Sequence, residues 1–437
     1  MKVIIAGGGI GGLRLAAYLE RNGHDVTVYE KQIGAEEMRY DWHDDVNPRA
    51  LVSAGLNIPE GSFPKSNWTF IGPNGESKKR LIQTYENIDW SVERKAINRE
   101  LFSLLKDTKV VFNATVSKLI TENDKVVGAE ITNRLGQRER VFCDLVVDSS
   151  GVRSALRDSL CGNLEFPKPA PTDVFFAYRA FYERTDAPVP KETNKVYMKH
   201  IGEQGISWCI YDEPSDSVNV LIGRVGGLSK ETLKNALDDL RARNPILGNK
   251  VLRGGIVAEI PVRRPLSRFA CDGYVLIGDS ACMTVPMIGS GIATSLKAAE
   301  ILADVIGKET VNTEEKLFEY QARVFKEFGA LHCYVEIIKN WMLRQKDETV
   351  DWFFSSGIVN NKDMCSMAVG KKMRLTLKDC LIKGWIGLDY PKVLAGMLKM
   401  LSKANEAYAK AYAIPQVYDK KKVAAWRKKA DGVFKYL

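Results

Sequence analysis

Residues 3–31 read VIIAGGGIGGLRLAAYLERNGHDVTVYEK and decide the fold of the first part of the chain. Gly7, Gly9 and Gly12 form the pattern G-x-G-x-x-G directly after an apolar run. In such a turn the first glycine permits a tight bend, the second lets the backbone approach a pyrophosphate, and the third lets a helix pack closely on a strand. The helix that follows offers free N–H groups and the positive end of its dipole to the phosphates.

The residues around this turn predict a βαβ unit. The apolar run 2–6 predicts a buried strand, residues 11–22 predict an amphipathic helix, and residues 25–29 predict a second strand. Glu30 ends the second strand, where a carboxylate can accept hydrogen bonds from a ribose. The sequence therefore predicts dinucleotide binding. FAD and NAD both stay open at this point, because they share the same ADP half.

The composition is that of an ordinary globular protein with two or three structural units. Of its 437 residues 45% are hydrophobic and 27% are charged. No apolar run approaches the ~18 residues of a membrane-spanning helix, and no signal peptide is expected, because the first strand begins at residue 2. The eight cysteines show no C-x-x-C pair and no metal-site spacing. We therefore expect reduced thiols, a cytoplasmic location and no bound metal.

The positive charge is concentrated towards the C-terminal end. The net charge is +9, but the residues from Ala330 onward hold 20 Lys and Arg against 10 Asp and Glu. This pattern indicates either solvated basic helix faces or attraction to an anionic membrane surface or a phosphorylated substrate. A nucleic-acid partner is not expected, because no nucleic-acid-binding motif accompanies the charge. Aromatic residues lie among these charges and fit a helical core, a hydrophobic tunnel or a helix at a membrane surface: Trp341, Trp352, Phe353, Phe354, Trp385 and Trp426.

Strand-like runs dominate the middle of the chain. Residues 32–106 predict loop and short helix, ending in a helix near 95–105. Alternating runs then predict a hairpin at 125–133 and 138–143 and an antiparallel sheet at 175–182, 195–200, 207–211, 218–223 and 251–260, with a helix at 230–243. A buried strand follows at 273–278 and a long helix at 286–307. From residue 314 onward the pattern is almost entirely helical.

A second motif, YVLIGDSA at residues 274–281, favours FAD. It predicts a buried strand that ends at Gly278 and Asp279, where a carboxylate can accept from ribityl or ribose hydroxyls. A glycine turn at a helix N-terminus suits the anion that builds up at N1–C2=O of a reduced flavin. The residues that lead into this helix are Pro286, Gly289, Gly291 and Ile292. A nicotinamide site requires no second element of this kind.

Three of these places together resemble the FAD-dependent oxidoreductases of the para-hydroxybenzoate hydroxylase fold, over about residues 1–310. Residues 7–12 with Glu30 are similar to the family's ADP-binding site. Arg94, in SVERKAINREL, is similar to the arginine near the FAD ribose and pyrophosphate, and residues 278–279 are similar to the Gly-Asp motif for the ribityl chain. The middle motif matches in part, because Ser150 stands in DSSG (residues 148–151) where the family has Asp.

Within that fold the chain is similar to the geranylgeranyl reductase branch. Residues 286–299, PMIGSGIATSLKAA, lack the Gln and Asn of the G-Q-G-x-N pattern of aromatic hydroxylases. Residues 205–211, GISWCIY, resemble that branch's aromatic strand over the substrate cavity. The chain departs from the branch at residues 39–45, where the reductases carry a Cys-Gly-Glu-Gly-like stretch.

The resemblance implies an α/β fold: a Rossmann-type FAD-binding domain (residues 1–170 and 262–310), an inserted antiparallel-sheet substrate domain (171–261) and a helical C-terminal region (311–437). It implies an FAD-dependent oxidoreductase that reduces C=C bonds of an isoprenoid or another small hydrophobic substrate, such as a lipid. NAD(P)H is a candidate electron donor. An aromatic monooxygenase using NAD(P)H and dioxygen is the first alternative, and a non-catalytic flavoprotein that binds a lipid or a partner is the second.

Two groups of residues are candidates for chemistry. Tyr40, Asp41 and His43 lie in YDWHDD, where a His beside a carboxylate can donate a proton to a carbanion or enolate, although the same residues also suit a surface turn. Tyr178, Trp208 and Tyr211 lie on predicted strands as candidate substrate contacts or core residues. Trp208 and Tyr211 are three positions apart, so they do not share one face of a strand.

Overall fold

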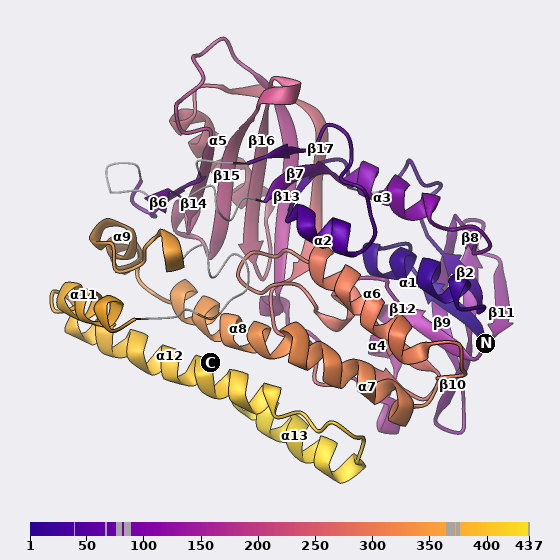
Figure 1. Cartoon of the computed structure of the whole chain (residues 1–437). Helices are drawn as coiled ribbons and strands as arrows, with labels where there is room; N and C mark the ends of the chain where they lie inside the picture. Colours follow the sequence, from indigo (N-terminus) through magenta and orange to yellow (C-terminus); the bar gives the residue numbers. More distant parts are fainter. Residues whose placement is uncertain are drawn as a thin grey trace.

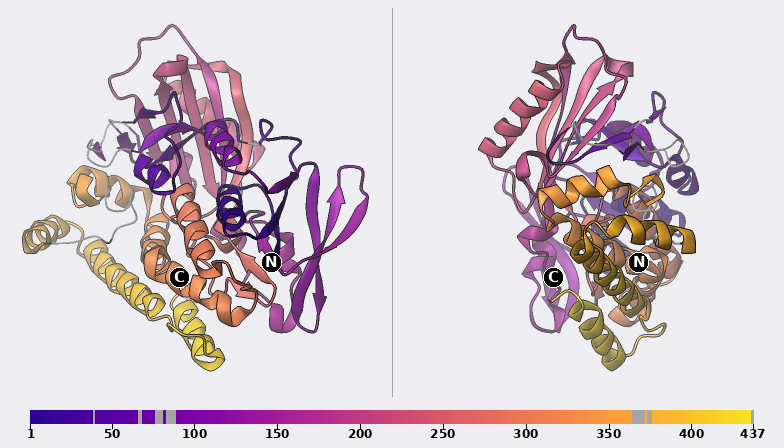
Figure 2. Two further views of the ribbon diagram at one scale, coloured as in Figure 1. Left: turned by 45° about the vertical axis from the view of Figure 1, so that its right-hand side comes forward. Right: turned by 90° about the vertical axis from the view of Figure 1, so that its left-hand side faces the viewer.

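The computed structural model describes residues 1–38, 40–65, 68–75, 81–82, 89–363, 372 and 376–435. Figure 1 shows a broad sheet at the top, the Rossmann-type unit at the right and long helices along the bottom. Figure 2 shows the same three parts from two other sides. The expected α/β fold with an inserted sheet and a helical C-terminal region is confirmed.

The predicted βαβ unit is present at the N-terminus. It consists of β1 (Lys2–Ala6), α1 (Ile10–Arg21) and β2 (Asp25–Tyr29). β1 pairs in parallel with β2 on one side and with β12 (Leu145–Asp148) on the other. The complete sheet has the order β18-β19-β12-β1-β2-β8, with β8 at Lys109–Val111, β18 at Ala270–Cys271 and β19 at Tyr274–Leu276. The central strands β1 and β12 are buried at every position except Lys2, and the three-stranded sheet described next contacts β12 and β2.

Beside this unit lies a three-stranded sheet of β9 (Ala114–Glu122), β10 (Lys125–Asn133) and β11 (Arg138–Phe142). β10 and β11 form the predicted hairpin. β9 extends the hairpin by one strand that the sequence pattern did not reveal. The short helix α4 (Ala155–Ser159) follows β12.

The inserted sheet has seven strands in the order β17-β13-β16-β15-β14-β5-β6. Its antiparallel part agrees closely with the expected runs: β13 (Val174–Arg184), β14 (Asn194–Met198), β15 (Gly205–Asp212), β16 (Ser217–Val225) and β17 (Leu247–Pro261). The helix α5 covers one face and spans Lys230–Arg243, as predicted. Short 3₁₀ turns join several of these strands.

The prediction of loop and short helix for residues 32–106 is wrong in part. These residues form α2 (Pro48–Ser53), α3 (Arg94–Ser103) and five short strands: β3 (His43–Val46), β4 (Phe63–Pro64), β5 (Trp68–Ile71), β6 (Leu81–Ile82) and β7 (Trp90–Glu93). β3, β7 and β4 form a small sheet, whereas β5 joins the inserted sheet beside β14. Strands of two to four residues are too short to show a clear period, and their partners lie far away in sequence.

The C-terminal region is helical, as expected. After α6 (Ile292–Ile306) of the FAD-binding domain, it contains α7 (Glu314–Val324), a π-helical turn (Phe325–Gly329), α8 (Ala330–Leu343), α9 (Asp347–Ser356), α11 (Leu377–Gly387), α12 (Pro391–Tyr412) and α13 (Lys420–Gly432). α12 runs along α8 in every view (Figures 1 and 2). No described helix is both long enough and apolar enough to cross a membrane. Seven cysteines are free thiols, and Cys365 lies outside the described residues.

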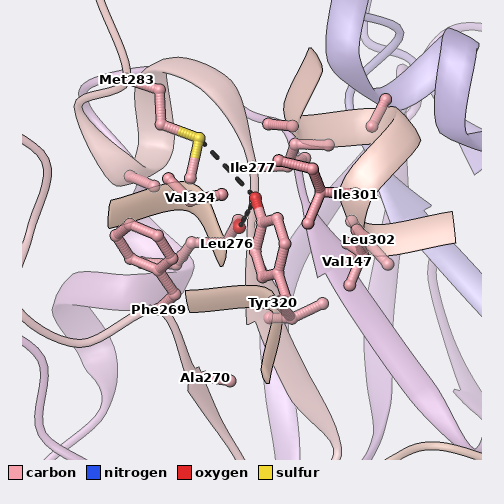
Figure 3. Packing of buried hydrophobic residues seen from close by; sticks show 14 of the residues in the cluster. Val147, Phe269, Ala270, Leu276, Ile277, Met283, Ile301, Leu302, Tyr320 and Val324 are labelled. Carbon is pink, nitrogen blue, oxygen red and sulfur yellow. Dashed lines mark hydrogen bonds between the residues drawn. The ribbon is translucent and has the colours of Figure 1, made fainter. Parts of the chain in front are cut away.

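The helices α6 and α7 are joined to the six-stranded sheet by a close-packed apolar core (Figure 3). Tyr320 of α7 is fully buried there, and its hydroxyl donates to the carbonyl oxygen of Leu276 at 3.2 Å. The sulfur of Met283 lies 3.6 Å from the same hydroxyl. The buried tyrosine therefore ties α7 to the strand that precedes the second glycine motif.

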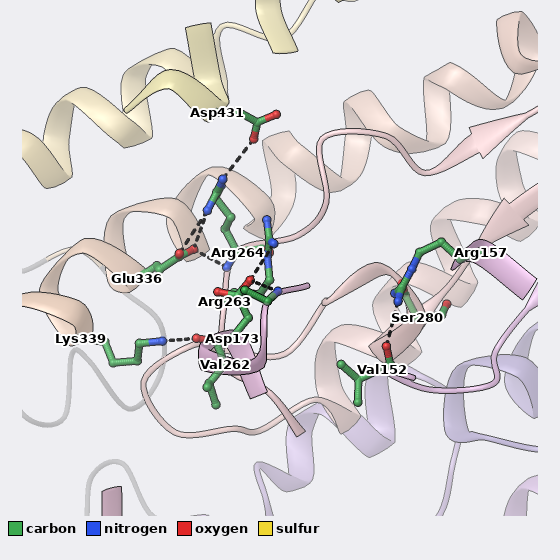
Figure 4. A network of polar contacts seen from close by, with 11 residues as sticks. Val152, Arg157, Asp173, Val262, Arg263, Arg264, Ser280, Glu336, Lys339 and Asp431 are labelled. Atoms are coloured by element: carbon green, nitrogen blue, oxygen red, sulfur yellow. Dashed lines mark hydrogen bonds and ion pairs between the residues drawn. The ribbon is translucent and has the colours of Figure 1, made fainter. Parts of the chain in front are cut away.

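Ion pairs and a hydrogen bond connect the C-terminal helices to the loop after β17 (Figure 4). Arg264 pairs with Glu336 of α8 at 3.1 Å and with Asp431 of α13 at 3.2 Å. Lys339 donates to the carbonyl oxygen of Val262. Because each guanidinium or ammonium group has a charged or carbonyl partner, these contacts fix α8 and α13 against the segment that leads to β18.

Candidate flavin site

The two glycine motifs meet at the carboxyl-terminal edge of the six-stranded sheet. β1 and β19 both pair in parallel with β12, so the turns that follow them lie at the same edge. A Cβ on Gly11 would lie 3.2 Å from Ile277 and 3.5 Å from Ser295 of α6. α1 and α6 therefore begin side by side, each directly after a glycine-rich turn.

The first motif has the geometry that its glycines require. Gly7 has φ +98°, and a Cβ there would lie 2.7 Å from the carbonyl oxygen of Ser149. A Cβ on Gly12 would lie 2.8 Å from the carbonyl oxygen of Gly7. Gly9 caps α1 without a side-chain hydrogen bond, so the first N–H groups of the helix are left for a ligand.

Glu30 closes this first half of the site. Its side chain is buried and accepts from the backbone N–H of Gly8 at 2.7 Å and of Gln32 at 2.9 Å. These bonds hold the carboxylate at the end of β2, beside the glycine turn. A carboxylate has lone pairs left over for the hydroxyls of a ribose.

The second motif surrounds the Asp279 carboxyl with glycine. Gly278 and Gly289 have φ of +68° and +66°, and a Cβ on Gly291 would lie 3.3 Å from Asp279 Oδ1 and 2.7 Å from Thr284. Burial raises the pKa of Asp279 to about 6, while the positive charge of Arg94 opposes this shift. Within the described residues its carboxylate takes part in no side-chain hydrogen bond, so it is free to receive one from a ligand.

The remaining predicted residues of this motif lead into α6. Pro286 lies in the turn, and Ile292 is the first residue of the helix and is buried. Gly291 is the N-cap and supplies no side-chain bond. The helix therefore presents bare N–H groups next to the Asp279 carboxylate, which is the combination expected for the ribityl chain and N1–C2=O of a flavin.

Arg94 lies between the cofactor motifs and the inserted sheet. Its Nη1 donates to Asp44 Oδ2 at 2.8 Å, and the guanidinium lies 5.2 Å from the ring of Tyr40. Its buried Nε has no hydrogen-bond partner among the described residues. FAD requires hydrogen-bond donors for its phosphates and acceptors for its hydroxyls. The site offers a free N–H on this arginine, two uncapped helix N-termini and two carboxylates, so the residues present fit this cofactor.

The partial middle motif has a structural explanation. Asp148 is buried and accepts from the Ser150 hydroxyl at 2.6 Å, the Tyr274 hydroxyl at 2.5 Å and the Ser154 hydroxyl. Ser150 therefore stabilises the turn after β12 by bonding to Asp148. Arg153, in the same turn, pairs with Glu259 of the inserted sheet.

The candidate residues of the 40–45 segment lie in a network of ion pairs. His43 Nε2 lies 3.1 Å from Glu93 Oε2, and its Nδ1 lies 3.0 Å from Ser91 Oγ. Burial alone would raise the pKa of Glu93, but hydrogen bonds from His43 and Arg253 lower it to about 2. Asp41 lies farther out, 3.5 Å from Arg253. Tyr40 packs on Trp42. The structure thus brings His43 and Asp41 to the same arginine-carboxylate cluster.

The candidate substrate residues divide between the two faces of the inserted sheet. Trp208 lies on the face opposite α5, with the guanidinium of Arg179 5.0 Å from its ring centroid. Tyr178 and Tyr211 belong to the apolar cluster beneath α5. Tyr178 bonds to the Tyr182 hydroxyl at 2.9 Å, and Tyr211 bonds to Asp216 at 3.0 Å. Only Trp208 therefore faces the side of the sheet that carries the cofactor motifs.

Two further residues connect this face to the cofactor motifs: Asp44, in the YDWHDD segment, and Arg179, which the sequence offers beside Tyr178 as a candidate substrate contact. Asp44 accepts from both Arg94 and Arg179, which links the cofactor motifs to the middle of the sheet. Arg179 is the one charged residue inside the run VFFAYRAFY (174–182). A lone charge at a strand position flanked by apolar residues is the signal that points to it.

Comparisons with known proteins agree with this geometry. Residues 5–35 match the family model described as an NAD(P)-binding Rossmann-like domain. A digeranylgeranylglycerophospholipid reductase from Sulfolobus acidocaldarius is 22% identical, over 99% of this chain and 96% of its own length. The chain is homologous to these reductases. The resemblance to the geranylgeranyl reductase branch is thereby confirmed, as is the predicted class of oxidoreductase.

Two solved structures show how widely the fold is shared. A geranylgeranyl bacteriochlorophyll reductase-like protein from Thermoplasma acidophilum superposes with a TM-score of 0.72 at 19% identity, covering 91% of this chain and 98% of that chain. A p-nitrophenol 4-monooxygenase from Pseudomonas putida superposes with a TM-score of 0.58 at 17% identity, covering 84% and 96%. A reductase-like protein and a monooxygenase therefore both have this fold.

Proposed function

We propose that the protein is an FAD-dependent oxidoreductase that reduces C=C bonds of a geranylgeranyl lipid. The observation that carries this proposal is the meeting of two uncapped, glycine-rich helix starts at one sheet edge, next to the face of the inserted sheet. A Cβ on Gly289 would touch Ile260 of that sheet at 3.4 Å, so the second motif and the sheet are in contact. The homologous reductases, named for geranylgeranyl lipids, support this choice of substrate.

In this proposal the cofactor is held in two halves. Glu30 and the start of α1 bind the ADP half, and Asp279 with the start of α6 binds the isoalloxazine half. When bound, FAD supplies the hydride equivalent for the reduction. NAD(P)H as the source of these electrons stays a prediction, since the matching family model covers only the ADP-binding unit that both cofactors share. The cytoplasmic location also stays a prediction.

The chain's own residues would exclude water and supply a proton. Across the sheet, Ile256, Leu221 and Val196 lie in one row with Arg179 and Trp208, and this row makes a largely apolar surface. His43 is the candidate proton donor, and its ring is held by the Glu93 carboxylate at 3.1 Å and the Ser91 hydroxyl at 3.0 Å. The role of Tyr40 and Asp41 in catalysis stays a prediction.

The test is anaerobic reduction of the purified flavoprotein by light, followed by mixing with one compound at a time. We expect a geranylgeranyl lipid to reoxidise the flavin and to gain two hydrogens at a double bond, as measured by mass spectrometry. Reoxidation by dioxygen alone, with hydroxylation of a phenol, would favour the monooxygenase instead. If no prenyl, phenolic or enone compound reoxidises the flavin, the non-catalytic alternative is supported.

A further inference from the structure

Arg179 is buried in the middle of the inserted sheet and only partly paired. Its Nη1 lies 3.3 Å from Asp44 Oδ1, and the rings of Trp42 and Trp208 flank the guanidinium at 5.2 and 5.0 Å. Its Nε and Nη2 are shielded from solvent and have no hydrogen-bond partner among the described residues. Leaving such donors unpaired in a protein interior is costly, which suggests that a ligand completes them.

Asn219 adds a second free donor on the same face. It is 1% exposed, its Oδ1 accepts from Trp208 Nε1 at 3.4 Å, and its Nδ2 has no partner within the described chain. The register pairs Arg179 with Leu221, so Asn219 lies one pleat further along the same face of the neighbouring strand. Trp208 thus contacts both residues, and the atoms of both that lack a partner among the described residues are N–H donors.

We propose that Arg179 and Asn219 bind the anionic headgroup of the substrate. Free N–H groups beside apolar and aromatic side chains select a ligand that is hydrophobic and carries an acceptor oxygen. A guanidinium favours a phosphate or carboxylate in that position. This proposal rests on the proposed function and adds a second requirement to it. The substrate must carry a negative charge near the double bond that is reduced.

Binding can be measured without turnover, from the change in the visible spectrum of the oxidised flavin on adding a ligand. The probes are geranylgeranyl phosphate, geranylgeranoic acid and the neutral geranylgeraniol. We expect Arg179→Met to weaken binding of the phosphate by about 100-fold, in line with loss of a charge-assisted hydrogen bond, and to change geranylgeraniol binding less than about threefold. Asn219→Leu should weaken phosphate binding by about tenfold, and it is the second variant if Arg179→Met does not fold.

Tyr178→Phe is the matched control, because Tyr178 is the neighbouring residue on the opposite face. The headgroup proposal would be overturned if Arg179→Met and Asn219→Leu both bound geranylgeranyl phosphate as tightly as the wild type. It would also be overturned if these variants lost as much affinity for geranylgeraniol as for geranylgeranyl phosphate. A phosphate preference over the carboxylate would identify a phospholipid or prenyl phosphate, and the reverse would identify a prenyl acid. If the wild type binds the phosphate in an Arg179-dependent way but is never reoxidised by it, the proposed reaction fails and this site remains.

A separate observation concerns α11, at the outer end of α12 (Figure 1). Leu381, Ile382 and Trp385 on this helix are 75%, 47% and 77% exposed, and Leu388 just after it is 66% exposed. Positions 381, 385 and 388 follow helical spacing and form one face. We name these four residues the α11 surface. Large apolar side chains that gather in this way mark an interaction site, whereas single exposed ones do not.

The inner side of α11 is held in place. Lys383 pairs with Asp363 and donates to the carbonyl oxygen of Ile358. Ile386 packs on the buried cluster of Trp352 and Phe353. Because this side already has its contacts, the α11 surface is the side turned away from the protein.

We propose that the α11 surface inserts into an anionic phospholipid membrane. Lys378 is exposed one turn before Ile382, and Lys392 and Lys399 are exposed on the adjoining α12, so basic groups accompany the apolar face. An apolar face containing Trp and Leu, accompanied by lysines, is typical of helices that lie in the membrane interface. The excess positive charge from Ala330 onward adds long-range attraction to an anionic surface.

The test is flotation of the full-length protein with vesicles of phosphatidylcholine, with and without phosphatidylglycerol. We expect binding to the anionic vesicles that weakens with salt, and at least a roughly tenfold loss in the double variant Leu381→Ser with Trp385→Ser. Leu135→Ser is the control, because Leu135 is 82% exposed in the turn after β10. Equal binding by the double variant would overturn the proposal. So would light scattering that shows a wild-type dimer and a monomeric double variant, because a second copy would then cover the surface.

Discussion

The two faces of the inserted sheet are both buried, but they are buried in different ways. Beneath α5, apolar residues such as Val220, Ile222 and Leu240 fill the space, and the Tyr178 and Tyr182 hydroxyls pair with each other. On the opposite face Arg179 and Asn219 keep donors that have no partner in the described part of the chain. The α5 face is mainly an apolar core, although Thr69 Oγ1 and Arg224 Nε on it also lack a partner among the described residues. On the opposite face the unpaired donors belong to one guanidinium and a neighbouring amide, a grouping that a ligand can complete. Substitutions on the first face should therefore change stability, and those on the second should change activity.

The largest expected effect is on stability, from Leu240→Ala beneath α5. Leu240 is fully buried in the cluster under the helix. Its truncation should lower the free energy of unfolding by about 2–5 kcal/mol, through lost burial and a residual cavity. Denaturant unfolding measures this loss. At a temperature where the variant is folded, kcat/KM with a geranylgeranyl lipid should equal that of the wild type, and a clear fall in kcat/KM would break the distinction between the faces.

The counterpart on the opposite face is Trp208→Leu. Trp208 is half-buried and contacts Arg179 and Asn219. Removing the indole should lower kcat/KM by about tenfold, because the donors that it positions become mobile, an effect of about 1.4 kcal/mol. The free energy of unfolding should change less than in Leu240→Ala. A normal kcat/KM together with a large loss of stability would show that Trp208 contributes to stability and not to substrate binding.

The cofactor side of this face should respond to pH through Asp279. Its pKa is raised to about 6, so the ionised carboxylate that accepts a ribityl hydroxyl is lost as pH falls through about 6. We expect FAD to bind about tenfold more weakly at pH 5 than at pH 7. Fluorescence titration of the apoprotein measures this change. Asp279→Asn should bind FAD weakly at both values, and an undiminished pH dependence in this variant would assign the effect to another group.

The same raised pKa makes a second prediction, for the apoprotein, with the opposite sign. A carboxyl whose pKa rises on folding stabilises the fold at low pH, and this stability is lost as pH rises from about 4 to about 6. Asp279→Asn should therefore stabilise the apoprotein at pH 7 but not at pH 4. At pH 7 the ionised Asp279 carboxylate thus lowers the stability of the apoprotein while it strengthens the binding of FAD.

The sequence predicted the parts of the site whose geometry is local. Gly7, Gly9 and Gly12 lie within one turn, so their spacing was enough to predict the shape of that turn, and Gly278 with Asp279 form a similarly local turn. The strands of the inserted sheet were predictable because each is long enough to show its alternation. The face of the sheet on which each β13 residue lies was not predictable, because alternation shows which residues share a face but not which face meets the cofactor.

The network around Arg94 was beyond prediction for a related reason. Asp44, Glu93, Arg179 and Arg253 come from four strands far apart in the sequence, and only the tertiary fold brings them together. β3 and β7, which carry two of them, are four residues each and show no period. The candidate segment 40–45 was still recognisable, because carboxylates and aromatic rings rarely gather in a surface loop without partners.

The smallest expected effect comes from Tyr178→Phe, which tests a candidate substrate contact directly. Tyr178 lies in the same strand as Arg179, one position away, and β-strand geometry turns the two side chains to opposite faces. Loss of the bond to the Tyr182 hydroxyl should lower the free energy of unfolding by about 1 kcal/mol. Steady-state kinetics should show unchanged kcat and KM. A raised KM would mean that the substrate reaches the α5 face. A residue whose hydroxyl is paired within the core would then also contact the ligand, and the distinction between the two faces would have to be abandoned.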